Sequence, residues 1–380
     1  MTLLKYEWRK LARIVSLWVF AALCLAFNLF YIATNGYYRQ SFHEASQTAV
    51  QLGQRIDDTF LERLSGMERT KYQTIILEKG QELTNVFASH DTAELTELYR
   101  YWLGDSLAER WIAQKYEKLS IRADHLAQTG AALDLYAGPI TSDVHTFLFG
   151  QLMRIMLVEA SILGMLSMLA LLGHEEIHHT TQTVCASRIG RKLFFWKIAA
   201  GLSAALALYL LIVAVTLGVY FALWDYSGIW SASISSGFNQ LTDMLYSRPV
   251  LTWADFTVAG YLAAVLTLGA ALSVVIALLA AFVWVVVRRV YLAALALIVA
   301  CLGSLVVPSV LAELRLWTAY AVCTFQPGLM ALNPNGWFTE LGMSAFIPWQ
   351  ETVVTVSWLA ALGGGTALLL KRMNRKDLLA

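Results

Sequence analysis

Residues 173–197 read GHEEIHHTTQTVCASRIGRKLFFWK and form a polar interruption between two long apolar runs. Two acids, Glu175 and Glu176, come first, and hydroxyl and amide residues follow them. The stretch then turns basic, with Arg188, Arg191, Lys192 and Lys197. This order predicts a short amphipathic helix within 174–190, a turn near Ser187 to Gly190, and a basic anchor that leads into the next apolar run.

Composition places the chain among membrane proteins. Hydrophobic residues make up 58% of the sequence and charged residues only 14%, with a mean hydropathy of +0.56. A soluble domain has roughly a quarter of its residues charged. The net charge of +1 argues against a nucleic-acid partner. The four cysteines, at positions 24, 185, 301 and 323, have no metal-ligand spacing, so no metal site is expected from them.

The apolar runs predict an all-α polytopic membrane protein with six transmembrane helices. A bilayer core needs roughly 20 consecutive apolar residues in a helix. The expected spans are 14–34, 147–172, 198–223, 256–287, 290–311 and 352–370. The last five lie within 147–380, which also holds the polar stretch.

Two segments outside these spans have their own character. Residues 35–146 are rich in charge, and their apolar side chains recur at intervals of three and four, which predicts a helical extracellular domain with breaks at Gly66 and Gly104. The run from Ala312 to Gln350 is apolar but contains Pro327, so it predicts re-entrant outer helices between spans 5 and 6.

The distribution of bases predicts the orientation. The segments expected inside are richer in bases: three of them carry four each and one carries two. These are Lys5, Arg9, Lys10 and Arg13, then Arg188, Arg191, Lys192 and Lys197, then Arg288 and Arg289, then Lys371, Arg372, Arg375 and Lys376. The two short outer loops hold one base each, Arg248 and Arg315. The positive-inside rule therefore puts both termini in the cytoplasm.

Two further groups of residues are candidates for function. Residues 1–13 predict an interfacial helix on the cytoplasmic side that carries Lys5, Glu7, Trp8, Arg9 and Lys10. Its bases either set the topology or contact a partner. Within span 2, Arg154 and Glu159 are charges at membrane depth. Glu159 either lines a translocation path or is a hydrogen-bonded packing residue.

The sequence His174-Glu175-Glu176-Ile177-His178 matches H-E-x-x-H, in which two histidines one helical turn apart bind zinc and the glutamate acts as general base. A catalytic zinc of this kind needs a third protein ligand. His179 points elsewhere on a helix, and Asp377 is the one later acid expected on that side. A surface helix without metal is the favoured interpretation, and a membrane zinc protease is the alternative.

No other catalytic signature is found in the sequence. There is no G-x-x-x-x-G-K-[ST] phosphate loop and no G-x-S-x-G nucleophile elbow. No catalytic residue and no cofactor are therefore expected on this chain.

The layout resembles that of the permease subunits of type 2 ABC transporters. It has a short basic interfacial helix, a first span, a variable outer domain, a second span and an inner stretch with an acid, a Thr, a Ser-Arg pair and a Lys. Here these are Glu176, Thr181, Ser187, Arg188 and Lys197. The outer domain is unusually long, and Cys185-Ala186 stands where the family often has a Pro.

The resemblance implies an exporter of a peptide, lipid or amphipathic compound in a plasma membrane, expected to be bacterial. Two separate P-loop ATPase subunits would bind ATP and Mg²⁺, and a second permease chain, identical or homologous, would complete the path. The stretch 174–190 would be the coupling helix, with Glu175, Glu176, His178, Thr181, Ser187 and Arg188 at the ATPase contact. A sensor or immunity membrane protein that transports nothing is the alternative outside this class.

Overall fold

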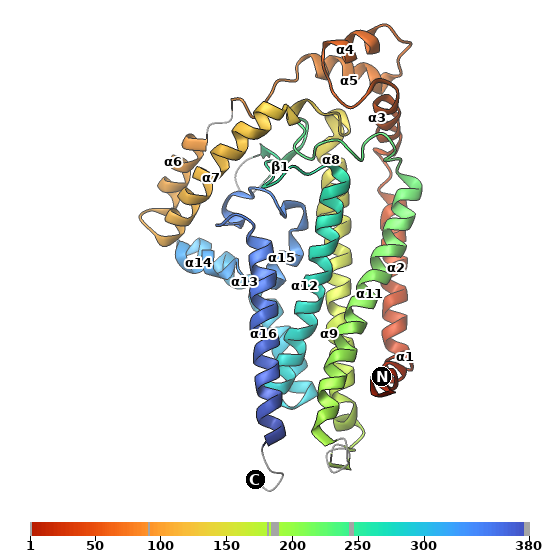
Figure 1. Ribbon diagram of the computed structural model, residues 1–380, viewed down its shortest axis with the longest axis vertical. Helices are drawn as coiled ribbons and strands as arrows, with labels where there is room; N and C mark the ends of the chain where they lie inside the picture. Colours follow the sequence, from red (N-terminus) through yellow and green to blue (C-terminus); the bar gives the residue numbers. More distant parts are fainter. Residues whose placement is uncertain (1, 90–91, 181, 184–189, 243–246, 376–380) are drawn as a thin grey trace.

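The computed structural model describes residues 2–89, 92–180, 182–183, 190–242 and 247–375 of the 380-residue chain (Figure 1). Within these ranges, six helices are long and apolar enough to cross a membrane. They are α2 (Val15–Thr34), α9 (Met153–Ile177), α11 (Leu193–Leu223), α12 (Val258–Val287), α13 (Val290–Glu313) and α16 (Gln350–Arg375). The chain is thus a mostly helical protein compatible with a multi-pass membrane topology, as its apolar runs predict.

The six helices form one elongated bundle with two distinct ends (Figure 1). We call the end with α1 (Thr2–Ala12), the α9–α11 connection and the α12–α13 connection the basic end. The opposite end, which carries residues 39–140, is the domain end. The side of a membrane on which each end lies stays a prediction.

Helix α9 packs against α2, α11, α12 and α13 and is central to the bundle. Small residues allow the close approach of its neighbours. A Cβ placed at Gly164 would lie 3.1 Å from the Cβ of Ala205 in α11, because the two backbones almost touch there. In α16, Gly365 lies against Phe282 of α12, whereas Gly364 has nothing within 4 Å.

The domain end is helical, as expected. It contains α3 (Arg39–Leu52), α4 (Asp58–Ser65), α5 (Lys71–Gln81), α6 (Thr92–Leu103), α7 (Leu107–Thr129), η1 (Ala131–Leu133), η2 (Gly138–Ile140) and α8 (Thr141–His145). Gly66 follows the end of α4 and Gly104, with φ +61°, separates α6 from α7, so both predicted breaks are confirmed. The predicted domain boundary at residue 146 is not a break. Helix α8 continues through the π-helical segment η3 (Thr146–Leu152) into α9.

The connections at the domain end also contain elements that the sequence did not predict. Strands β1 (Gln240–Thr242) and β2 (Ser247–Pro249) pair antiparallel, so the fold is not purely α-helical. Three residues are too short for an alternating pattern to be recognised in the sequence. Between α13 and α16 lie two short helices, α14 (Trp317–Cys323) and α15 (Pro327–Leu332), and the 3₁₀ turns η5 (Pro334–Gly336) and η6 (Gly342–Ser344). Pro327 begins α15, where a proline costs no backbone hydrogen bond.

A buried charge cluster around Glu340 joins the helical domain to these connections. Lys115 of α7 is fully buried and lies 3.4 Å from the Glu340 carboxylate, and its ammonium also donates to the carbonyls of Gly342 and Ala345 at 2.7 and 2.8 Å. Arg248 of β2 approaches the same carboxylate at 3.3 Å. Three segments far apart in the sequence therefore meet at one carboxylate.

Two tyrosines complete this cluster. The Tyr116 hydroxyl donates to Glu340 and accepts from Arg248 at 2.9 Å, while Tyr99 accepts a second hydrogen bond from Arg248. Burial, together with the negative charge of Glu340, raises the pKa of Tyr116 well above its usual value. Its hydroxyl therefore stays protonated and keeps donating.

Replacing Glu340 by Gln tests how far this cluster holds the domain. The change removes the negative charge that Lys115 and Arg248 both approach inside the protein, so we expect the free energy of unfolding to fall by about 3 kcal/mol. Melting of the purified protein in mild detergent, followed by tryptophan fluorescence, measures the effect. The matched control is Glu82→Gln, which removes a carboxylate from an exposed pair with Lys79 and should leave the melting temperature unchanged. Equal melting of the two variants would contradict the role given to Glu340.

Candidate functional site

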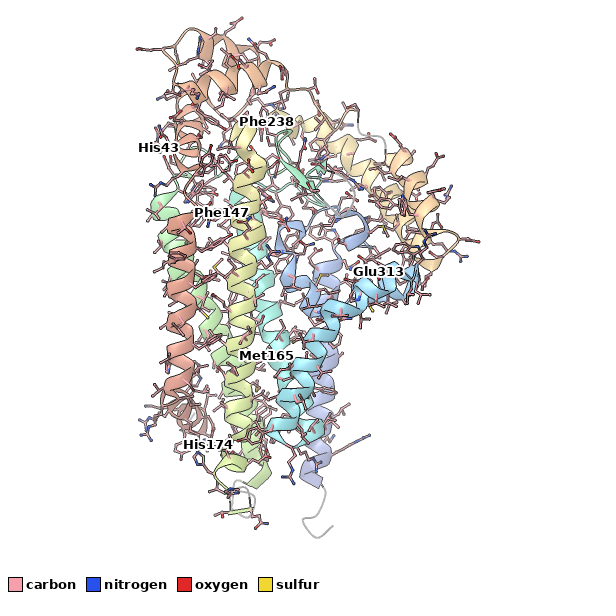
Figure 2. All side chains as sticks on the ribbon, turned by 180° about the vertical axis from the view of Figure 1, so that it is seen from behind. His43, Phe147, Met165, His174, Phe238 and Glu313 are labelled. Carbon is pink, nitrogen blue, oxygen red and sulfur yellow. The ribbon has the colours of Figure 1, made fainter. Side chains whose placement is uncertain are left out.

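Four charged residues form an alternating chain at the basic end of the bundle. Lys10 of α1 lies 2.9 Å from Glu7 and 3.0 Å from Glu175 of α9, and Glu175 also pairs with Lys197 of α11. We call Glu7, Lys10, Glu175 and Lys197 the four-charge chain. Glu7 and Lys197 are fully buried and Glu175 is 4% exposed. In Figure 2 the labelled His174 marks this end of the bundle.

Charges so deeply buried are stable only when they are paired. The Lys197 ammonium is also 2.5 Å from the carbonyl oxygen of Leu171, an acceptor in the last turns of α9. Burial alone would lower the pKa of Lys10, but Glu7 and Glu175 outweigh this effect and raise that pKa. Lys10 therefore remains charged throughout the neutral range. The ion pairs of the four-charge chain join α1, α9 and α11.

The expected interfacial helix is present as α1, and its residues divide into two sets. Glu7 and Lys10 face the bundle, and the Trp8 indole donates to the Ser203 hydroxyl of α11 at 3.0 Å. Lys5 and Arg9 are exposed. The helix is thus anchored to the bundle by one face, and only its other face is open to lipid or a partner.

Glu175, which the sequence predicts at an ATPase contact, is buried and paired with Lys10 and Lys197 inside the bundle. The coupling helix over 174–190 stays a prediction, and its first residues, Glu175 among them, belong to the end of α9, which continues through Ile177. The ion pairs of Glu175 hold this last turn in the bundle. The chain then leaves the helix at His178 and His179, where His179 adopts φ 56°.

Glu176 has a structural contact of its own. Its carboxylate accepts a hydrogen bond from the backbone N–H of Val290 at 2.9 Å, at the first residue of α13. A carboxylate at a helix N-terminus satisfies a free N–H and complements the helix dipole. Gly173 packs so closely on Val290 that an added Cβ would come within 2.6 Å of that side chain. The end of α9 is therefore fastened to the beginning of α13.

The H-E-x-x-H match does not form a zinc site among the described residues. The His174 and His178 rings do come together, with centroids 4.6 Å apart. Yet the carboxylate that would serve as general base is the one paired with Lys10 and Lys197. No group of three or more His, Cys, Asp or Glu side chains with metal-binding geometry occurs in the part of the chain that the structure describes.

The exposed end of this region begins at Ile177, which is 48% exposed, and includes His178. Three residues predicted at the ATPase contact, Thr181, Ser187 and Arg188, lie outside the described residues. Of the predicted coupling residues that the structure describes, His178 is the one on the surface, whereas Glu175 and Glu176 hold helices together.

A second polar group lies inside the bundle, between α2, α9 and α11. Glu159 is 8% exposed and accepts a hydrogen bond from the Asn28 amide at 2.8 Å. The same amide donates to Thr216 at 3.1 Å. Both Asn28 and Thr216 are fully buried. This geometry fits a hydrogen-bonded packing residue, whereas Arg154 on the same helix is exposed and makes no contact with Glu159.

Sequence reasoning missed the partners in both groups. Asn28 was hidden in an apolar span, although an amide at membrane depth is itself a signal of a polar neighbour. The sequence predicts Lys197 as part of a basic anchor, because a lysine at the end of a span usually has that role. Only its position opposite Glu175 reveals the ion pair.

Comparisons with known proteins identify no relative, since no family model, no curated protein and no solved structure matches the chain.

Replacing Lys10 by Met tests the four-charge chain. Glu7 would be left fully buried without its ion-pair partner, so we expect a loss of about 3 kcal/mol of unfolding free energy and faster trypsin cleavage after Arg9. The control is Lys5→Met on the exposed face of the same helix, which should change neither property. If Lys10→Met melted and digested like Lys5→Met, α1 would not depend on this chain.

Proposed function

We propose that this chain is the membrane-spanning subunit of an ATP-driven ABC transporter that exports a peptide, a lipid or another amphipathic compound. In this proposal, ATP is hydrolysed by two separate subunits at the basic end, which faces the cytoplasm. A second permease chain, identical or homologous, completes the pathway. The membrane is the plasma membrane, and the chain itself contributes no catalytic residue.

The observation that carries the proposal is the four-charge chain. It joins α1 and the adjacent ends of α9 and α11 through buried ion pairs, and Glu176 adds the first residue of α13. A force applied to the connection after Ile177 therefore acts on several helices at once. Rigid-body movement of helices is the usual way in which a local event changes access to a transmembrane path.

The arrangement of surfaces is consistent with a partner at this end. Ile177 and His178 are exposed at the end of α9, next to the buried Glu175, and Lys5 and Arg9 are exposed on α1. An apolar side chain surrounded by polar ones is a typical protein contact. The bases at this end, counted along the sequence, agree with a cytoplasmic location.

One observation favours a second function, that of a sensor which transports nothing. The Glu340 cluster joins α7 of the helical domain to two connections, the one that contains β2 before α12 and the one that contains Glu340 before α16. A ligand that moved α7 would therefore also move the segments that lead into α12 and α16. The two functions differ in whether an ATPase is bound.

Purification of the tagged chain from its native membrane in mild detergent, with mass spectrometry of what is retained, tests the proposal. We expect a stoichiometric subunit with a phosphate loop. A folded chain that is recovered without any such subunit would favour the sensor.

A variant at the exposed turn makes this test more specific. His178→Glu should reduce the recovered ATPase at least about tenfold, a change of about 1.4 kcal/mol in binding free energy. The control is Lys371→Glu, an exposed charge change near the end of α16, which should leave recovery unchanged. Equal recovery with both variants would contradict docking at the turn.

Replacing Glu176 by Lys tests transmission rather than docking. The variant loses the hydrogen bond to Val290 and adds a cation beside Arg288 and Arg289 at the start of α13. We expect normal recovery of the complex and basal ATP hydrolysis within about twofold of wild type, but no stimulation by amphipathic compounds in liposomes. Glu176→Gln keeps an acceptor and should retain stimulation. If amphipathic compounds still stimulated ATP hydrolysis in the lysine variant, the coupling role of Glu176 would be contradicted.

A further inference from the structure

A cavity of about 250 Å³ lies near the domain end, between α13, α14, α15 and the beginning of α16. Its walls are largely apolar, and they include Leu305 and Pro308 of α13 and Met330 of α15. Figure 2 shows this region around the labelled Glu313, where α13 ends and the chain turns away from the bundle into α14. The cavity is separate from the four-charge chain and from Glu159.

One acidic side chain, Glu351, lines this cavity. It is 4% exposed, and no Lys, Arg or His among the described residues lies within ion-pair distance of it. The contrast with Glu340 is direct, because Glu340 is buried to the same degree but is approached by both Lys115 and Arg248. Its carboxylate meets the Thr352 hydroxyl at 3.5 Å and is otherwise held by backbone N–H groups, those of Phe338 and of the first residues of α16.

The position of Glu351 explains how a carboxylate can be held there without a base. It lies in the first turn of α16, where the helix dipole and free N–H groups favour negative charge. The cavity is therefore lined by an acid that has no base of the described chain beside it, and a cation bound there would favour its ionised form. A cationic ligand would supply the missing charge, whereas an anionic ligand would be repelled.

The remaining lining residues suit an organic cation. Tyr320 and Trp337 are on the cavity wall, and aromatic rings attract ammonium groups in addition to the attraction of a carboxylate. The volume is slightly below the range of pockets that enclose a drug-sized molecule, so it fits a head group better than a whole ligand.

The shape of the entrance indicates where the rest of the ligand lies. Leu305 lines the cavity and is also 49% exposed on the outer face of α13. Its neighbours Leu302 and Val306 are exposed on the same helix, by 58% and 59%. The cavity wall thus continues into a long apolar surface, along which an alkyl chain can lie as it does among lipid tails.

We propose that this cavity binds the ammonium head of a cationic amphiphile beside Glu351, with the alkyl chain along α13. The assignment does not depend on the proposed function, because the site is formed by this chain alone and binding requires no ATPase.

The test uses the purified full-length chain in maltoside micelles and tritiated dodecyltrimethylammonium as the probe. Scintillation proximity binding should saturate at one probe per chain. Glu351→Gln should weaken binding at least tenfold, because the ion pair is lost while the shape is kept. The matched control is Glu313→Gln, an exposed acid at the end of α13, which should bind within twofold of wild type.

A second variant keeps the test decisive if Glu351→Gln does not fold. Leu305→Trp reduces the space at the entrance and should also abolish saturable binding, while its melting temperature without the probe shows that the chain is folded. Binding that is unchanged in both variants, or that never saturates in wild type, overturns the proposal. Displacement of the probe by phosphatidylethanolamine would identify a lipid head group as the natural occupant, and displacement by dodecylamine alone would identify a free amphiphile.

Discussion

A charge buried in an apolar bundle must have a partner, and this requirement governs both ends of the protein. At the basic end, Glu175 is shared by Lys10 and Lys197, which belong to different helices. At the domain end, Glu340 is shared by Lys115 and Arg248. Removing one member of such a group costs several kcal/mol, because the others remain buried. Each group therefore holds its segments in one relative position.

The helices of the bundle differ in how many buried polar contacts hold them to their neighbours. Helices α1, α9 and α11 are joined by ion pairs at one end, and α2 joins α9 and α11 through Asn28 in the interior. Helix α13 is different, because most of its apolar surface is exposed and its described polar link to α9 is the hydrogen bond from Val290 to Glu176. A helix held mainly at its beginning is the element most able to change position relative to the others, and it also borders the cavity that contains Glu351.

Glu351 shows how the same rule indicates a ligand. Three of the deeply buried acids, Glu175, Glu340 and Glu159, have their bases or amides within the chain. Glu351 is held by backbone N–H groups, has no base beside it among the described residues, and lines a cavity rather than a packed interface. The difference between these acids lies in their surroundings, since nothing in the residues next to them in sequence distinguishes them.

The sequence predicts the six membrane-length helices, the helical domain between the first two of them, and the breaks at Gly66 and Gly104. These features follow from local properties, since an apolar run of bilayer length or a repeat of three and four residues is visible within one segment. The tertiary structure alone decided which charges meet. Lys10 and Glu175 are 165 residues apart and Lys115 and Glu340 are 225 apart, so no local pattern could pair them. For this reason Glu175 and Glu176 were predicted on a partner surface, whereas the packing of α1, α11 and α13 around α9 makes them internal contacts.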